Sequence, residues 1–144
     1  MLYKAYLVIG GMPEVVNNYL LNECNLNEVD YSLQNDILVQ YMVDMSQYTY
    51  KNESIKINAI YKAIPRELAR ENKVFEFSLV HVNARYSRYK ISLEWLVASN
   101  MVIKCNLTNK CESPLSVYSD DDTFKLYMSD VGLLRSLANI DCRR

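Results

Sequence analysis

The residues with the clearest chemical potential are the basic side chains in the middle of the chain. The run Arg85-Tyr86-Ser87-Arg88-Tyr89-Lys90 opens an expected helix, and Lys104 follows on an expected strand. Cations in such positions neutralise phosphates of a duplex. Four of them are therefore the predicted contacts to duplex DNA: Arg85, Arg88, Lys90 and Lys104. The alternatives are a solvated charged face, or contacts to the acidic residues 1–54.

No set of residues typical of catalysis, cofactor binding or metal binding can be assembled from the remaining side chains. His81 is the only histidine, and the four cysteines (24, 105, 111 and 142) match no common zinc spacing. We expect them to be reduced and buried. The triplet Asp120-Asp121-Asp122 lacks the spacing of a calcium loop and is expected to be a turn. Gly10-Gly11-Met12-Pro13-Glu14 has no lysine to hold a phosphate, so it is interpreted as a helix start.

Charge is spread unevenly along the 144 residues, although the formal net charge is only -1. Residues 1–54 carry two lysines against seven acids, and residues 55–110 carry ten basic residues against four acids. Residues 111–144 carry four basic residues and six acids. A basic middle between acidic flanks indicates two surfaces with different partners, or pairing between these parts of the chain.

Hydrophobic spacing predicts helices in the first half of the chain. A helix should begin at Pro13 and fade near residue 22, and the strongest apolar stripe predicts another near residues 27–50. The polar residues 51–54 then mark the best internal boundary. Ser54 is expected to cap a further helix, and Pro65 is expected to kink or restart it.

The second half is expected to contain a helix at about 85–99, a strand at 101–107 and a second strand at 124–128 that pairs with it. Residues 114–118 are expected to be extended, and Asp130 to cap a last short helix. The helix at 85–99 should be largely buried, with Arg85, Arg88, Ser92 and Ser99 as its polar strip. This order is typical of a winged helix-turn-helix. The predicted fold class is mainly α with a small β-hairpin wing, and a helical bundle with an appended hairpin is the alternative.

Several segments together resemble a prokaryotic family of AAA-type ATP-binding proteins. Gly10 to Val16 resembles its GGMPE signature, and Ile64 to Phe75 is similar to its IP..LA.EN.KF stretch. Leu93-Glu94-Trp95-Leu96 matches its LEWL element, and the segment from Phe124 to Leu134 matches its closing FKLY..DVGLL. The resemblance implies the region after the ATPase core, with a helical part at 1–53 and a winged helix at 54–144 that includes the C-terminal short helix.

The family's Walker A and Walker B segments have no counterpart here, so the resemblance does not carry over ATP binding or hydrolysis. It implies a non-catalytic accessory region that has a P-loop ATPase domain as its partner. A free-standing winged-helix DNA-binding regulator is the alternative. We further expect no cofactor, no membrane segment, a cytoplasmic location, and self-association through apolar faces of the helices at 27–50 and 85–99, as in a swapped dimer.

Overall fold

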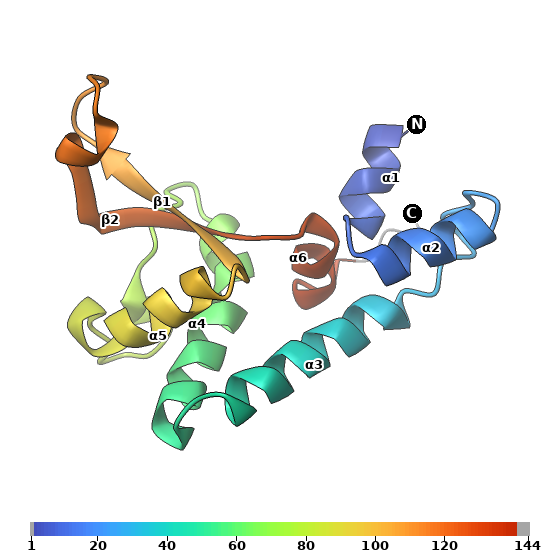
Figure 1. The fold of residues 1–144 in the computed structure, drawn as a ribbon, viewed down its shortest axis with the longest axis horizontal. Helices are drawn as coiled ribbons and strands as arrows, with labels where there is room; N and C mark the ends of the chain where they lie inside the picture. The colour runs from blue at the N-terminus through green and yellow to red at the C-terminus, as the bar shows by residue number, and fades with distance from the viewer. Residues whose placement is uncertain (1, 141–144) are drawn as a thin grey trace. The chain divides into compact units, whose positions relative to one another are not determined.

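A computed structural model describes residues 2–140 (Figure 1). The chain is mainly α-helical with one small β-hairpin, as the sequence predicts. It divides into two compact units. The first unit combines the residues up to Tyr48 with those from Asp130 onward, and the second unit is Thr49–Ser129. This division differs from the predicted ranges 1–53 and 54–144, because the last helix packs against N-terminal helices instead of the hairpin.

The first unit contains four described helices: α1 (Leu2–Ile9), α2 (Pro13–Leu21), α3 (Ser32–Gln47) and α6 (Val131–Leu137). Helix α6 packs against both α1 and α3. The helix predicted at 27–50 begins later than expected, at Ser32. Asp30 accepts hydrogen bonds from the backbone N–H and hydroxyl of Ser32, which holds the preceding residues in turns. Val29 still joins the apolar core of this unit from one of those turns.

A buried polar network joins the helices of the first unit. The Gln34 side chain is fully buried, and its Nε2 donates to the carbonyls of Val8 and Ile9, each at 3.0 Å. Arg135 Nε donates to the Val8 carbonyl at 3.1 Å, and its Nη2 donates to Gln34 Oε1. These donors satisfy the last carbonyls of α1, which have no partner within that helix. Gly132 lies against the Ile9 carbonyl and the Gln34 side chain, where no further side chain fits.

The second unit begins with α4 (Lys51–Leu68), which starts earlier than predicted. Ser54 does not cap this helix: it lies inside the first turns, and its hydroxyl donates to the Lys51 carbonyl at 2.9 Å. The helix also continues through Pro65 to Leu68. A proline removes only one amide donor, and burial of Ile60 and Ile64 stabilises the turns beside it.

The rest of the second unit is a short 3₁₀ turn, a helix and the hairpin. These elements are η1 (Phe77–Leu79), α5 (Tyr86–Ala98), β1 (Val102–Thr108), a second 3₁₀ turn η2 (Leu115–Tyr118) and β2 (Ser119–Met128). The predicted pairing is confirmed, with Val102 opposite Met128 and Asn106 opposite Phe124 in an antiparallel register. Strand β1 packs on α5, and β2 packs on α4.

Three details correct the predictions for the hairpin region and for the cysteines. Residues 115–118 are a 3₁₀ turn instead of an extended segment, closed by a hydrogen bond from Val117 N to the Pro114 carbonyl. The acidic triplet lies within β2, where the register shifts between Asn106 and Leu107 of the partner strand. Three cysteines are free thiols, but they are exposed instead of buried: Cys24, Cys105 and Cys111. Cys142 lies outside the described residues.

Candidate nucleic-acid interface

The predicted basic site lies at the start of α5. Arg85 is the N-cap residue of this helix, with an extended backbone and no side chain capping the first turn. Its carbonyl accepts the first helical hydrogen bond, from Arg88 N at 3.0 Å. The positive end of the helix dipole and both guanidinium groups therefore belong to the same turn, which favours an anionic ligand.

Both arginines line an open pocket of about 490 Å³ together with the loop Val82-Asn83-Ala84. Their side chains are exposed. Across residues 2–140, the structure gives neither guanidinium group an ion pair or a hydrogen bond. Both groups thus keep all their donors for an external partner, which is what phosphate binding requires. The loop residues were not singled out from the sequence, where Asn83-Ala84 marks only a polar break before the helix.

The other two predicted cations differ from this pair. Lys90 is exposed on α5, and its Nζ lies 3.9 Å from a carboxylate oxygen of Glu94, a weak surface pair. Lys104 is used within the hairpin, where its Nζ donates to the Asp121 carbonyl at 2.9 Å. The same Nζ lies 4.6 Å from the ring centre of Phe124. The geometry therefore brings Arg85 and Arg88 together and adds Lys90 on the same helix. Lys104 donates within the hairpin, and its Nζ also lies 5.9 Å from the ring centre of Tyr86 at the start of α5.

The tyrosines of α5 serve packing, as the sequence predicts for aromatic residues on helix stripes. The ring centres of Tyr86 and Tyr89 lie 5.8 and 5.6 Å from the ring centre of Phe77. Tyr86 also contacts Phe124, and burial raises its pKa. Neither ring is an exposed platform for stacking on bases, so the site can offer cations and backbone amides to a ligand.

The buried side of α5 fixes the direction of the arginines. Leu93 and Leu96 are buried against the rest of the unit. Ser92 is fully buried, and its hydroxyl donates to Glu53 Oε2 of α4 at 2.6 Å. Hydrogen bonds from Lys56 and from Ser92 lower the pKa of Glu53. This contact locks α5 onto α4 and leaves the arginine turn facing solvent.

Ser92 therefore corrects the predicted polar strip, of which it was expected to be a solvent-facing member. The expectation that α5 is largely buried is also wrong, because Ile91 is 72% exposed. Residue spacing shows which positions share a helix face, but a hydroxyl can lie on a covered face when a buried partner accepts its hydrogen bond.

The glycine loop is structural in its described contacts. Gly11 N donates to Asp130 Oδ2 at 2.6 Å, and Asp130 Oδ1 accepts from Leu133 N at 2.8 Å. The Asp130 carboxylate thus accepts a hydrogen bond from the Gly11 amide of the GGMPE segment and also caps α6. The second contact confirms the predicted cap. Pro13 begins α2, which confirms the predicted helix start. The loop and the closing DVGLL segment, at opposite ends of the sequence, meet through this one side chain.

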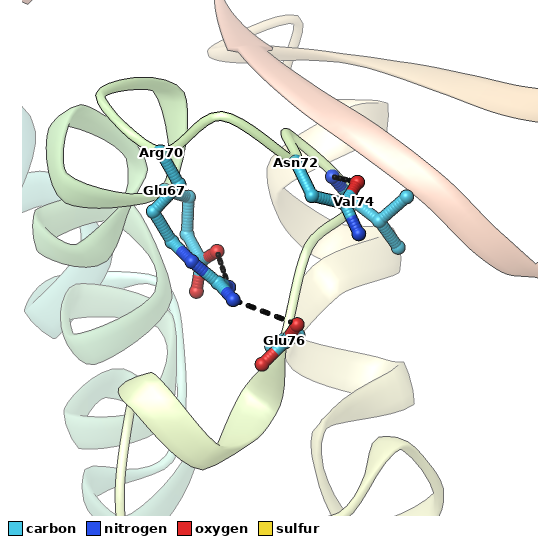
Figure 2. Close-up of polar contacts among 5 residues, drawn as sticks. All are labelled: Glu67, Arg70, Asn72, Val74 and Glu76. Carbon is cyan, nitrogen blue, oxygen red and sulfur yellow. Dashed lines mark hydrogen bonds and ion pairs between the residues drawn. The ribbon is translucent and has the colours of Figure 1, made fainter.

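An arginine that bridges two carboxylates, one buried and one 42% exposed, was not found from the sequence. Arg70 donates to Glu67 Oε2 at 3.3 Å and to Glu76 Oε1 at 2.9 Å. Figure 2 shows the guanidinium group of Arg70 between these two carboxylates. Glu67 is buried, and desolvation raises its pKa. The cluster ties the end of α4 to the segment that leads to η1. The three-residue spacing of Glu67 and Arg70 was the available signal, since such pairs are neighbours on a helix.

The described side chains form no group of three or more potential metal ligands. His81 is exposed, and its Nδ1 accepts a hydrogen bond from Asn83 N at 3.3 Å. The carboxylate of Asp120 accepts from Asp122 N at 2.9 Å, which lowers its pKa. Within residues 2–140 no helix has both the length and the apolar character needed to cross a bilayer.

Comparison with protein families finds one match, and it spans residues 1–144. The matching family is described as a domain of unknown function, DUF8612. The chain belongs to this family. No curated protein sequence and no solved structure matches the chain.

Proposed function

We propose that this DUF8612 chain is a non-catalytic binding module whose second unit contacts the phosphates of duplex DNA through the start of α5. The observation that carries the proposal is the pair of exposed guanidinium groups, Arg85 and Arg88, that line one open pocket and have no partner among residues 2–140. Unpaired arginines are the residues best suited to phosphate oxygens, because their fork of donors matches that geometry.

The order of elements supports the proposal. Helix α4, the η1 turn, helix α5 and the β1–β2 hairpin follow one another as in a winged helix-turn-helix. In that arrangement the helix before the hairpin faces the duplex, and here it is the helix that begins with the arginine pocket. The basic balance of residues 55–110 adds long-range attraction to a polyanion. Because no aromatic platform is exposed on α5, we expect binding that depends on backbone phosphates and little on base sequence.

The test is fluorescence anisotropy with a short labelled duplex of arbitrary sequence, between about 50 and 200 mM salt. We expect measurable binding at the low end of this range that weakens steeply as salt rises. Arg85→Ala and Arg88→Ala should each weaken binding several-fold and reduce the slope of log K against log salt by about one. A second duplex of unrelated sequence should bind with a similar affinity.

The matched control is Arg66→Ala, which removes an exposed arginine of α4 outside the pocket. It changes the net charge by the same amount, so it measures the general electrostatic effect. An equal loss of affinity in Arg66→Ala and Arg88→Ala contradicts the proposed site. Absence of binding by the wild-type chain at the lowest salt contradicts the function itself.

A second proposed role is that of accessory region to an AAA-type ATPase. It is favoured by the contact that joins the two ends of the resemblance, in which Asp130 of the DVGLL segment holds Gly11 of the GGMPE loop. The two motifs are thus in direct contact within the first unit. Chemical cross-linking in the cells that express the chain, followed by mass spectrometry, should identify a P-loop protein attached to the first unit. Cross-links exclusively to proteins without a P-loop contradict this role.

A further inference from the structure

A second surface lies in the first unit, where α1 and α2 diverge from the Gly10–Gly11 turn (Figure 1). The two helices enclose an apolar groove of about 550 Å³. Its walls are aliphatic and aromatic side chains of both helices, and none of the lining residues within 2–140 is charged. The groove belongs entirely to the first unit, so it is separate from the arginine pocket of α5.

The side chains around the groove are exposed to an unusual degree for apolar residues. Leu2, Tyr3, Tyr6 and Leu20 line it and are 82%, 73%, 52% and 59% exposed. Together they present on the order of 600 Å² of largely apolar surface, a patch size that marks interaction sites on soluble proteins. Burial of apolar surface, and not charge, drives the binding of a partner to a groove of this kind.

We propose that the groove is the contact between two copies of this chain, with α1 of each copy seated in the α1–α2 groove of the other. The same helix supplies both the groove wall and the protruding leucine and tyrosine side chains. A two-fold arrangement requires this kind of self-complementary patch. With every exposed atom of these four residues covered in both copies, the burial is at most about 1,200 Å² in total, the lower end of the range for specific protein–protein interfaces.

The charge of the first unit determines how this dimer responds to salt. Its described residues carry two basic side chains, Lys4 and Arg135, against seven acids. Two copies therefore repel each other electrostatically while the apolar patches attract. Raising the salt concentration screens the repulsion and leaves the apolar contribution in place. The dimer should tighten as salt rises, in the opposite direction to the proposed DNA binding.

The experiment is sedimentation equilibrium of the whole chain over a concentration series, at low and moderate salt. We expect a reversible monomer–dimer equilibrium that shifts toward dimer at the higher salt. Leu20→Glu places a charge in the groove and should raise the dimer Kd at least about tenfold. Leu21→Glu is the matched control, because Leu21 is the next residue of α2, is 75% exposed, and does not line the groove.

Leu20→Lys separates groove disruption from net charge, because it makes the first unit less acidic but should weaken the dimer as Leu20→Glu does. Far-UV circular dichroism shows whether each variant keeps its helices. A monomer at every concentration and salt overturns the proposal, and so does an equal effect of Leu20→Glu and Leu21→Glu. A dimer that persists in both groove variants places the interface elsewhere and overturns it too.

Discussion

Replacement of Gly132 by alanine tests the packing that joins the two ends of the chain. Alanine is favoured over glycine inside a helix by about 1 kcal/mol. Helix propensity alone therefore predicts that Gly132→Ala stabilises α6. The structure predicts the opposite, because a Cβ at this position lies 2.6 Å from Gln34 Nε2 and from the carbonyl carbon of Ile9. One of these neighbours is the backbone of α1, which cannot rotate away as a flexible side chain can.

The expected magnitude follows from the contacts that must shift. Overpacking of a buried site costs about 1–3 kcal/mol. Moving α6 away from α1 also weakens the hydrogen bond from Arg135 to the Val8 carbonyl, which contributes about 1 kcal/mol. After the gain in helix propensity of about 1 kcal/mol, we expect a net destabilisation of the first unit of about 1–3 kcal/mol.

The other two glycines provide an ordered series. A Cβ at Gly11 meets only Asp130 Oδ2 at 3.6 Å, an ordinary contact, so Gly11→Ala should be close to neutral. Gly10 has a φ of 73°, and a Cβ there overlaps the carboxylate of Asp130. Gly10→Ala should therefore destabilise the unit by about 1–2 kcal/mol, from left-handed backbone strain and loss of the Asp130 position.

The assay must report on the two units separately. Hydrogen–deuterium exchange of α1 and α6 amides in urea follows the first unit. Fluorescence of Trp95, the only tryptophan and a residue of α5, follows the second. Gly132→Ala should lower protection in α1 and α6 far more than Gly11→Ala does. Equal or greater stability of Gly132→Ala refutes the proposed close contact between α6 and α1.

Three further predictions concern the second unit. Ser92→Ala removes the hydrogen bond to Glu53 and should lower the free energy of unfolding by about 1–2 kcal/mol, measured by Trp95 fluorescence; the same loss in the exposed control Ser87→Ala contradicts it. Because burial raises the pKa of Glu67, the folded state holds this proton more tightly than the unfolded chain does. The stability this group contributes is full at acidic pH and is lost as pH rises through the folded-state pKa. Glu67→Gln should remove that part of the pH dependence in urea titrations, and an unchanged pH profile argues against it. Lys104→Ala should leave DNA affinity within about twofold of wild type, because Lys104 is engaged with Asp121 and Phe124. The same substitution should lower hairpin stability by about 1 kcal/mol. A loss of DNA affinity as large as that of Arg88→Ala contradicts this structural role of Lys104.

Local chemistry made much of the fold predictable. Pro13 begins α2, Asp130 caps α6, and the alternating residues of β1 and β2 pair in the antiparallel register. Each of these features depends on residues close in sequence or on a simple period of two. The helix at 85–99 was predictable within one residue at each end for the same reason.

The candidate site was predictable in part. Arg85 and Arg88 were identified because basic residues at a helix start attract anions. That Lys104 donates to the carbonyl of Asp121 depends on the pairing of the two strands, which brings together residues that are far apart in the sequence. The Glu67–Arg70–Glu76 cluster was missed because its third member lies beyond α4 and meets the others only after the chain turns (Figure 2).

Residue types and their spacing were enough to predict the starts of α2, α5, α6 and β1, the segments that pair in the hairpin, and the cations that open α5. The packing of distant segments settled which covered faces accept polar groups, as Ser92 and Gln34 show, and which apolar face stays open between α1 and α2. This division arises because periodicity reports only the chemical character of each side of an element. The neighbour that covers that side comes from a distant part of the chain, and its hydrogen bonds and shape decide whether a residue is buried or available.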